Sequence, residues 1–447
     1  MTNGSVELRH TVVSLSMSDV VMRVPSYRRR VVDDELDQLF SVLAALAIDG
    51  PKGVGKTSTA LERAATVFEL DSPAVVEVLR ADPSRLTAAH HPIVIDEWQR
   101  FPPAWDLVRR SVDRSNGPGQ FILTGSASPK SPETHSGAAR IVPVRMRPLT
   151  LPERGVDTPS VSLSVLLAGG RPPIDGSTTV SLEQYVDEIL GSGFPGMRHA
   201  SGRARRGIID GYLQLVVDRD FPDAAGRQVR NPSALRRWMA AYAAATSTTA
   251  AYDTIRDAAS HRQETPAKTT TQAYRDTLER MWILDPVPAW VPSRSHLSRL
   301  NEQSKHQLCD PAFAAALVRA NASTLLSGSA GDIALPRDGT FLGALFESLA
   351  ALDLRVFAQH AEARVFHLRT KAGEHEVDFI VERPDGSIVA VEVKLSATVD
   401  DAHVAQLRWL SGQIGTQLID SIVLTTGRNA YRRPDGVAVV PLALLGP

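Results

Sequence analysis

Apolar residues in the first third of the chain follow two alternating patterns. Four largely apolar segments predict buried strands, at Leu43–Ile48, Ala74–Leu79, Pro92–Asp96 and Gln120–Thr124, and the first of them is continuously apolar. Apolar residues at helical spacing predict helices at Val31–Ser41 and Lys56–Phe68. Because strands alternate with helices, we expect a parallel sheet in a doubly wound α/β domain, with ligands at the C-terminal ends of its strands.

The rest of the chain shows different patterns. Residues 157–181 are rich in Pro, Gly, Ser and Thr, which predicts a surface connection or insertion. Residues 182–240 have helical periodicity and predict a helical lid. Helices at Asp253–Ala259 and Thr269–Met281 predict a module similar to a helix-turn-helix, and the apolar segment 282–291 would be its wing. These patterns predict a helical middle with a winged-helix-like module.

The last part of the chain predicts a second α/β domain. A helix is expected at Phe341–Leu354, followed by strands at 376–382 and 387–395. The predicted segments are therefore an N-terminal extension (1–26), the first α/β domain (27–156), the insertion loop and lid (157–240), the winged-helix-like module (241–300) and the C-terminal α/β domain (301–447).

The composition narrows the class of protein. The chain has 447 residues, of which 43% are hydrophobic and 22% charged, as in a soluble globular protein. No apolar stretch reaches the roughly 20 residues that cross a bilayer, and Cys309 is the only cysteine, so we expect a cytoplasmic protein without disulfides. A net charge of -1 argues against a broad basic field for coating nucleic acid.

A phosphate-binding loop is predicted between the first strand and the second helix. The motif GxxxxGK[ST] is formed by Gly50, Pro51, Lys52, Gly53, Val54, Gly55, Lys56 and Thr57, and Ser58 follows it. The glycines allow backbone N–H groups to surround phosphate oxygens at a helix N-terminus. Lys56 would neutralise the β- and γ-phosphates of ATP, and Thr57 would bind Mg²⁺. The position between a buried strand and an amphipathic helix favours this interpretation over an ordinary glycine-rich turn.

Polar residues end two further strands. In Ile93–Glu97 an apolar strand ends in Asp96 and Glu97, of which the first would hold Mg²⁺ and the second would polarise the attacking water. Two carboxylates at the end of a buried strand need a cation or water near them, so a purely structural role is the weaker explanation. Thr124 ends another strand and would contact the γ-phosphate or the water, although Thr-Gly-Ser also serves simply to turn the chain.

The segments GPKGVGKT, IVIDEWQRFP, FILTGSAS and GAARIVPVRMRPLTLPE resemble a prokaryotic family of AAA-type ATPases. In that family the C-terminal half is a domain of unknown function (number 4143), restriction-endonuclease-like at its end. The resemblance extends from Tyr27 to about Ser396. It implies an arginine that closes the ATP site, here Arg140, but Ala139 stands where the family usually has Gly, and a solvated basic residue is the alternative.

Acids near the C-terminus form a second candidate site. The strand Glu376–Glu382 is joined to the next by Pro-Asp-Gly, which suits a three-residue hairpin loop. If Arg383 pairs with Ser387, Asp378 faces Glu392, with Lys394 on the same face. This is the arrangement of a PD-(D/E)xK nuclease, in which the acids bind Mg²⁺ and Lys394 positions or activates water.

Glu347, in the helix before this hairpin, would be a further metal ligand. The alternative is an exposed, charged strand face. A further set of basic residues in the helix-turn-helix-like module could contact phosphates, although neighbouring acids dilute the charge, and we favour an interaction or lid role: Arg256, His261, Arg262, Lys268 and Arg275.

Two functions are therefore carried forward. The first is an ATPase, with ATP and Mg²⁺, coupled to a metal-dependent nuclease-like domain that acts on DNA. The rival is an ATP-driven switch or interaction protein, with a protein partner or as a homo-oligomer, whose nuclease-like domain is inert.

Overall fold

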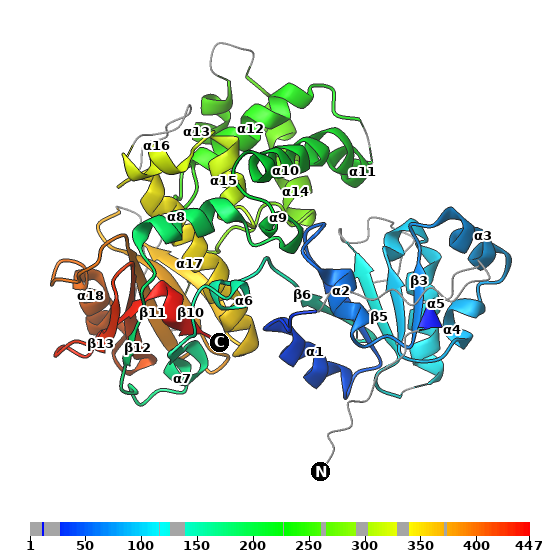
Figure 1. Ribbon diagram of the computed structural model, residues 1–447, viewed down its shortest axis with the longest axis horizontal. Coiled ribbons are helices and arrows are strands. Elements are labelled where there is room, and N and C mark those ends of the chain that lie inside the picture. Colours follow the sequence, from blue (N-terminus) through cyan, green and yellow to red (C-terminus); the bar gives the residue numbers. More distant parts are fainter. Residues whose placement is uncertain are drawn as a thin grey trace. The chain divides into compact units, whose positions relative to one another are not determined.

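The computed structural model describes residues 11–12, 27–115, 117–125, 139–226, 228–260, 265–291, 303–328, 339–370 and 373–447. The chain divides into two compact units, Met1–Arg147 and Pro148–Pro447 (Figure 1). Apart from Thr11 and Val12, the predicted N-terminal extension lies outside the described residues, as do His261 and Arg262.

The N-terminal unit is built on a parallel sheet in the order β1-β3-β4-β5-β2-β6. Its strands are β1 (Thr11–Val12), β2 (Ala45–Asp49), β3 (Thr66–Glu69), β4 (Ile93–Asp96), β5 (Phe121–Gly125) and β6 (Ile141–Arg145). Its helices are α1 (Val32–Phe40), α2 (Lys56–Leu61), α3 (Pro73–Ala81), α4 (Arg85–Ala88), η1 (Trp98–Arg100) and α5 (Pro103–Arg114).

Alternate residues of the central strands pack on opposite sides of this sheet. Ala45, Ala47, Ile93 and Ile95 join one core with side chains from α3, α4 and α5. The residues that alternate with these along the strands, such as Leu46 and Val94, point to the other side of the sheet and are also buried. Helices α1 and α2 contact β2. The expected parallel α/β architecture is confirmed, and it places the C-terminal ends of β2, β4 and β5 side by side.

Two predicted elements of this unit are wrong. The run Ala74–Leu79 was expected to be a strand but forms helix α3, which starts with Pro73 in its first turn and buries Val76 and Leu79 on one face. The helix expected at Lys56–Phe68 ends at Leu61, and the β-branched Thr66 and Val67 begin strand β3 instead.

The C-terminal unit contains a second sheet, in the order β8-β13-β14-β12-β11-β10-β9. Its strands are β8 (Asp175–Ser177), β9 (Arg364–Arg369), β10 (Glu376–Glu382), β11 (Ile388–Lys394), β12 (Leu418–Thr425), β13 (Asn429–Arg432) and β14 (Ala438–Pro441). β9, β10 and β11 form an antiparallel meander, and β12 is parallel to β11. Helix α17 (Phe341–His360) contacts the meander, and α18 (Ala405–Ile414) contacts β10, β11 and β12.

Residues 157–181 are part of this unit rather than only a surface connection. They form β7 (Val161–Ser162), α7 (Leu163–Leu167) and β8, and α7 contacts β11, β12 and α17. Leu163, Leu166 and Leu167 are buried because they lie on one face of the short helix. β8 pairs with β13, and β7 pairs with β15 (Leu445–Gly446).

Helices form the middle of the chain, as expected. They are α8 (Leu182–Gly191), α9 (Pro195–Arg198), α10 (Gly202–Leu215), the π-helix η2 (Val216–Asp220), α11 (Phe221–Ala225), α12 (Pro232–Ala244), α13 (Tyr252–Ala259), α14 (Lys268–Arg280), α15 (Pro311–Leu317) and α16 (Ala322–Leu326).

The predicted wing is not a hairpin of its own. Leu284, Val287 and Ala289 instead form single bridges with Leu308, Lys305 and His367. Four of the apolar side chains that suggested a wing are buried, Ile283, Leu284, Val287 and Trp290, whereas Val291 is 63% exposed.

Candidate functional site

The predicted phosphate-binding loop connects β2 to α2. Gly53 and Gly55 have positive φ values of 82° and 109°, which side chains rarely allow. A Cβ atom on Gly50 would lie 2.3 Å from the carbonyl oxygen of Met146, so only glycine fits at this position. The loop therefore has the sharp turns that bring backbone N–H groups to the start of a helix.

Lys56 is buried at the first position of α2. Its ammonium donates hydrogen bonds to the carbonyl oxygens of Gly50 and Pro51, both at 2.9 Å. Burial lowers the pKa of Lys56 to about 8, although the carboxylates of Glu97, Asp96 and Asp49 raise it. A phosphate in the loop would favour the charged ammonium and would take over these two hydrogen bonds.

The residues expected to bind Mg²⁺ are in contact. The Thr57 hydroxyl donates to Oδ1 of Asp96 at 2.8 Å, and the Thr124 hydroxyl donates to the same oxygen. β4, β5 and β2 are neighbours in the sheet, so their C-terminal ends bring these three side chains together. Thr57 and Asp96 are oxygen donors that fit Mg²⁺, which would neutralise phosphate charge there.

Glu97 follows Asp96 in a left-handed backbone conformation, with φ at 52°. Burial and the charge of Asp96 raise the pKa of Glu97, and Lys56 and Lys52 lower it. Gln99 donates a hydrogen bond to Oε2 of Glu97. Unfavourable backbone conformations of this kind are concentrated at functional sites.

Arg140 lies outside this group of contacts. Its Nε pairs with Oδ1 of Asp113 at 2.8 Å, and its side chain is 45% exposed. Its role in closing the ATP site remains a prediction from the family resemblance.

Arg30 is a site residue that the sequence did not suggest. Its guanidinium is buried and donates to the carbonyl oxygens of Val54, at 3.3 Å, and Arg147, at 2.9 Å. It thereby connects the phosphate-binding loop to the chain beyond β6. Three consecutive arginines at 28–30 gave no signal that only the last is buried.

The C-terminal hairpin has the register expected from its loop. Phe379 pairs with Val391 and Glu382 with Ile388, so Asp378 lies opposite Glu392. Gly386 has a φ of 83°, and the backbone N–H of Arg383 donates to the Ser387 carbonyl at 3.0 Å. A cavity of about 960 Å³ lies over this end of the hairpin, and its lining includes the four residues predicted for the second site: Glu347, Asp378, Glu392 and Lys394.

Two lysines supply the positive charge between these acids. Lys394 Nζ lies 2.6 Å from Oε2 of Glu392 and 3.8 Å from Oδ2 of Asp378. Lys305 Nζ lies 2.9 Å from Glu347, 3.1 Å from Glu376 and 3.3 Å from Asp378. The carboxylates raise the pKa of Lys305 well above its usual value, although its full burial would lower it.

Lys305 was not predicted, and two neighbours fix its position. Its backbone exchanges hydrogen bonds with Val287, at 2.8 and 2.9 Å. Five residues later, the buried carboxylate of Asp310 accepts hydrogen bonds from the Ser192 hydroxyl and the Gly193 N–H, at 2.8 and 2.7 Å. The segment is therefore held at both ends.

In this structure two lysines neutralise the acids for which a metal ion was predicted. Burial raises the pKa of Glu347 to about 8, and burial and Asp378 raise the pKa of Glu392 well above its usual value. Metal ligands must be ionised and must face an open position. Here Lys305 contacts oxygens of Glu347 and Asp378, and Lys394 contacts Oε2 of Glu392, while Oε1 of Glu392 has no hydrogen-bond partner among the described residues. Within the described part of the chain no three His, Cys, Asp or Glu side chains are grouped to hold a metal.

Comparisons with known proteins agree with the N-terminal geometry. Residues 44–154 match the family model of an AAA domain. The N-terminal unit carries an AAA-type P-loop domain. Residues 182–324 and 342–445 match two domains of unknown function, DUF8612 and DUF4143.

Two mycobacterial proteins match most of the chain, and their names assign no activity. The uncharacterized proteins Mb2031c of Mycobacterium bovis and Rv2008c of Mycobacterium tuberculosis are each 25% identical over 402 residues, which is 88% of this chain and 79% of theirs. The solved Walker-type ATPase PABY2304 of Pyrococcus abyssi is similar over 64% of this chain and 94% of its own, with 14% identity and a TM-score of 0.36. No helix in the described ranges is long and apolar enough to cross a membrane.

Proposed function

We propose that the AAA-type domain binds ATP with Mg²⁺ and hydrolyses it. The observation that carries this proposal is the hydrogen-bonded group of Thr57, Asp96 and Thr124 at the end of the phosphate-binding loop. It joins residues from α2, β4 and β5, where MgATP-binding proteins of this architecture hold the metal and the γ-phosphate.

Each residue would have a separate part in the reaction. The loop N–H groups and Lys56 hold the phosphates, and Thr57 and Asp96 hold Mg²⁺. Glu97 accepts a proton from the water whose oxygen bonds to the γ-phosphorus, while the bond to the β-phosphate oxygen breaks and ADP leaves. Its raised pKa brings Glu97 closer to the operating pH, which favours a general base.

A pair of variants tests hydrolysis separately from binding. Glu97→Gln should bind ATP like the parent protein but release phosphate roughly 10²- to 10⁴-fold more slowly, because the amide cannot accept the proton. Lys56→Ala should lose both binding and turnover. Titration calorimetry and phosphate release measure the two properties, with Arg80→Ala, an exposed charge on α3, as the control. Parental turnover in Glu97→Gln would assign that residue to structure.

We also propose that the C-terminal α/β domain does not cleave DNA and that the protein is an ATP-driven switch or interaction protein. The specific observation is Lys305, whose ammonium lies among the acids that a nuclease would use for its metal. The order helix, antiparallel meander, helix and parallel strand supports a nuclease-like ancestry for this domain, but a fold does not establish an activity.

Metal binding and DNA cleavage test this second proposal. Without nucleotide, the protein should bind no Mn²⁺ at these acids in titration calorimetry. With Mg²⁺ or Mn²⁺ it should leave plasmid and single-stranded DNA intact, with or without ATP. Cleavage that disappears in Asp378→Asn and in Lys394→Met would restore the nuclease hypothesis.

A further inference from the structure

A large cavity lies within the helical part of the C-terminal unit. Its volume is about 1340 Å³, which is enough for a sizeable ligand. It is lined by α11, α12, α14 and the segments before α12 and α14. Neither proposed function uses it.

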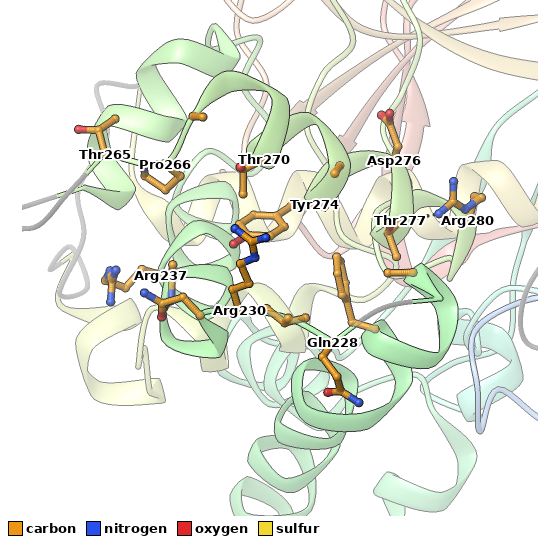
Figure 2. Close-up of a pocket in the computed structure, with 17 residues that line it drawn as sticks. Gln228, Arg230, Arg237, Thr265, Pro266, Thr270, Tyr274, Asp276, Thr277 and Arg280 are labelled. Carbon is orange, nitrogen blue, oxygen red and sulfur yellow. Dashed lines mark hydrogen bonds between the residues drawn. The ribbon is translucent and has the colours of Figure 1, made fainter.

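Three arginines dominate the charge of its lining. Figure 2 shows Arg230 extending towards Tyr274 in the middle of the view, with Arg237 and Arg280 on opposite sides. Among the described residues of the lining Asp276 is the one acid, and its carboxylate is paired with Arg275 at 3.0 Å. The cavity therefore carries an excess of positive charge.

These arginines differ from three other basic residues nearby on α12, α13 and α14. Arg236 forms an ion pair with Asp218 at 3.4 Å. Asp253 forms ion pairs with both Arg256, at 3.0 Å, and Lys268, at 2.7 Å. Across the described ranges, by contrast, no carboxylate pairs with Arg230, Arg237 or Arg280. Arg237 donates to the Ala259 carbonyl at 3.4 Å, and Arg280 donates to the Thr277 hydroxyl at 3.1 Å.

Other donors and an aromatic surface complete the cavity. Ala267 and Thr270, at the start of α14, are in its lining, and this helix has no side-chain cap at its N-terminus. Uncapped N–H groups and the helix dipole favour an anion there. Tyr274 contributes a ring that is supported by Phe221 and Trp238, with centroids 5.9 and 6.1 Å away.

We propose that this cavity binds a small ligand through its phosphate groups. Guanidinium groups form paired hydrogen bonds with phosphate oxygens, and three of them in one concave site need a multiply charged partner. A nucleic acid strand would need a basic track that continues outside the cavity. Arg236, Arg256 and Lys268 near the cavity are instead paired with acids, and the unpaired arginines of the lining face one concave volume, which favours a compact phosphorylated ligand. This proposal does not depend on ATP hydrolysis by the N-terminal unit.

Tripolyphosphate is a suitable probe, titrated into Lys56→Ala protein so that the P-loop does not contribute. We expect a single site whose affinity falls steeply with added salt. Arg237→Gln and Arg280→Gln should each weaken binding at least tenfold. Arg236→Gln is the matched control, since Arg236 is the neighbour of Arg237 on α12 but is paired with Asp218 and outside the lining. Its affinity should be unchanged.

Three results would overturn the proposal: no binding of tripolyphosphate, an equal loss in Arg236→Gln, or binding of single-stranded DNA that tripolyphosphate does not displace. The last would identify an extended nucleic-acid surface. Circular dichroism checks folding, and Arg237→Lys provides a second variant that keeps the charge. It should still bind more weakly, because an ammonium cannot form the paired hydrogen bonds of a guanidinium.

Discussion

Lys305 is fully buried, and its ammonium lies within 3.3 Å of carboxylate oxygens from Glu347, Glu376 and Asp378. Transfer of these charges from water is unfavourable, and their mutual attraction offsets it only while every partner is present. An acidic group that loses its lysine must take up protons or bind another cation. The stability of the C-terminal unit and the affinity of these acids for metal ions therefore both depend on Lys305.

This link makes Lys305→Met informative. The variant should lower the free energy of unfolding of the C-terminal unit by roughly 3–5 kcal/mol, because buried carboxylates lose their counter-charge. Arg369→Met is the matched control: Arg369 also pairs with Glu376, at 2.9 Å, but its side chain is 30% exposed, and its removal should cost roughly 0–1 kcal/mol. Urea unfolding measures both, and equal effects would show that Lys305 is not the main counter-charge.

The sequence predicts the contact of Asp378 with Glu392 but not the contacts of Lys305, for a physical reason. A three-residue loop with glycine at its last position fixes the hairpin register, so the two acids are set opposite each other by their nearest neighbours in the chain. Lys305 is 73 residues from Asp378, and only tertiary packing brings them together. In the N-terminal unit, Arg30 and Val54 are likewise brought into contact by tertiary packing and not by their positions in the sequence.

At the level of elements, strong periodicity and glycine-rich loops were predicted well, and short apolar runs were not. Residues 74–79 contain five apolar side chains among six, which suits a buried strand and one face of a helix equally. Pro73 supports the helix because its fixed φ suits the first turn and it has no N–H to leave unpaired.

The short strands at the edge of the second sheet could not be predicted. β8 consists of Asp175, Gly176 and Ser177, which have no preference for a strand. It pairs with β13, about 250 residues later, so its conformation comes from the partner strand. The low-complexity composition around it indicated only a connection.

At the scale of the whole molecule, burial of carboxyl groups makes stability depend on pH. Asp353 of α17 is completely buried and accepts hydrogen bonds from the Leu151 N–H, at 3.2 and 3.4 Å. Burial raises its pKa from 3.8 to about 8. The folded unit therefore keeps a proton that the unfolded chain releases, and its stability should decrease as the pH rises from about 4 to about 8.

Asp353→Asn tests this dependence, since the amide keeps a neutral acceptor for Leu151. Its unfolding midpoint should rise relative to the parent protein between pH 5.5 and pH 8.5. Asp385→Asn is the control in the same unit, because hydrogen bonds from Ser387 lower the pKa of Asp385 and its ionisation is complete below this range. If both variants keep a constant offset from the parent protein, Asp353 is ionised in the folded unit.

The stretch that matches DUF4143, residues 342–445, lacks parts on which its own structure depends. Lys305 lies before it, and so does β8, the strand that pairs with β13. A gene rearrangement that moved this stretch alone into another protein would deliver buried acids without their counter-charge and a sheet without its edge strand. The stretch of the gene that would have to move as a whole is therefore longer than the matched segment. It includes the helices between β8 and Lys305. Recombination within those helices should be selected against, so the two domains of unknown function would be inherited together.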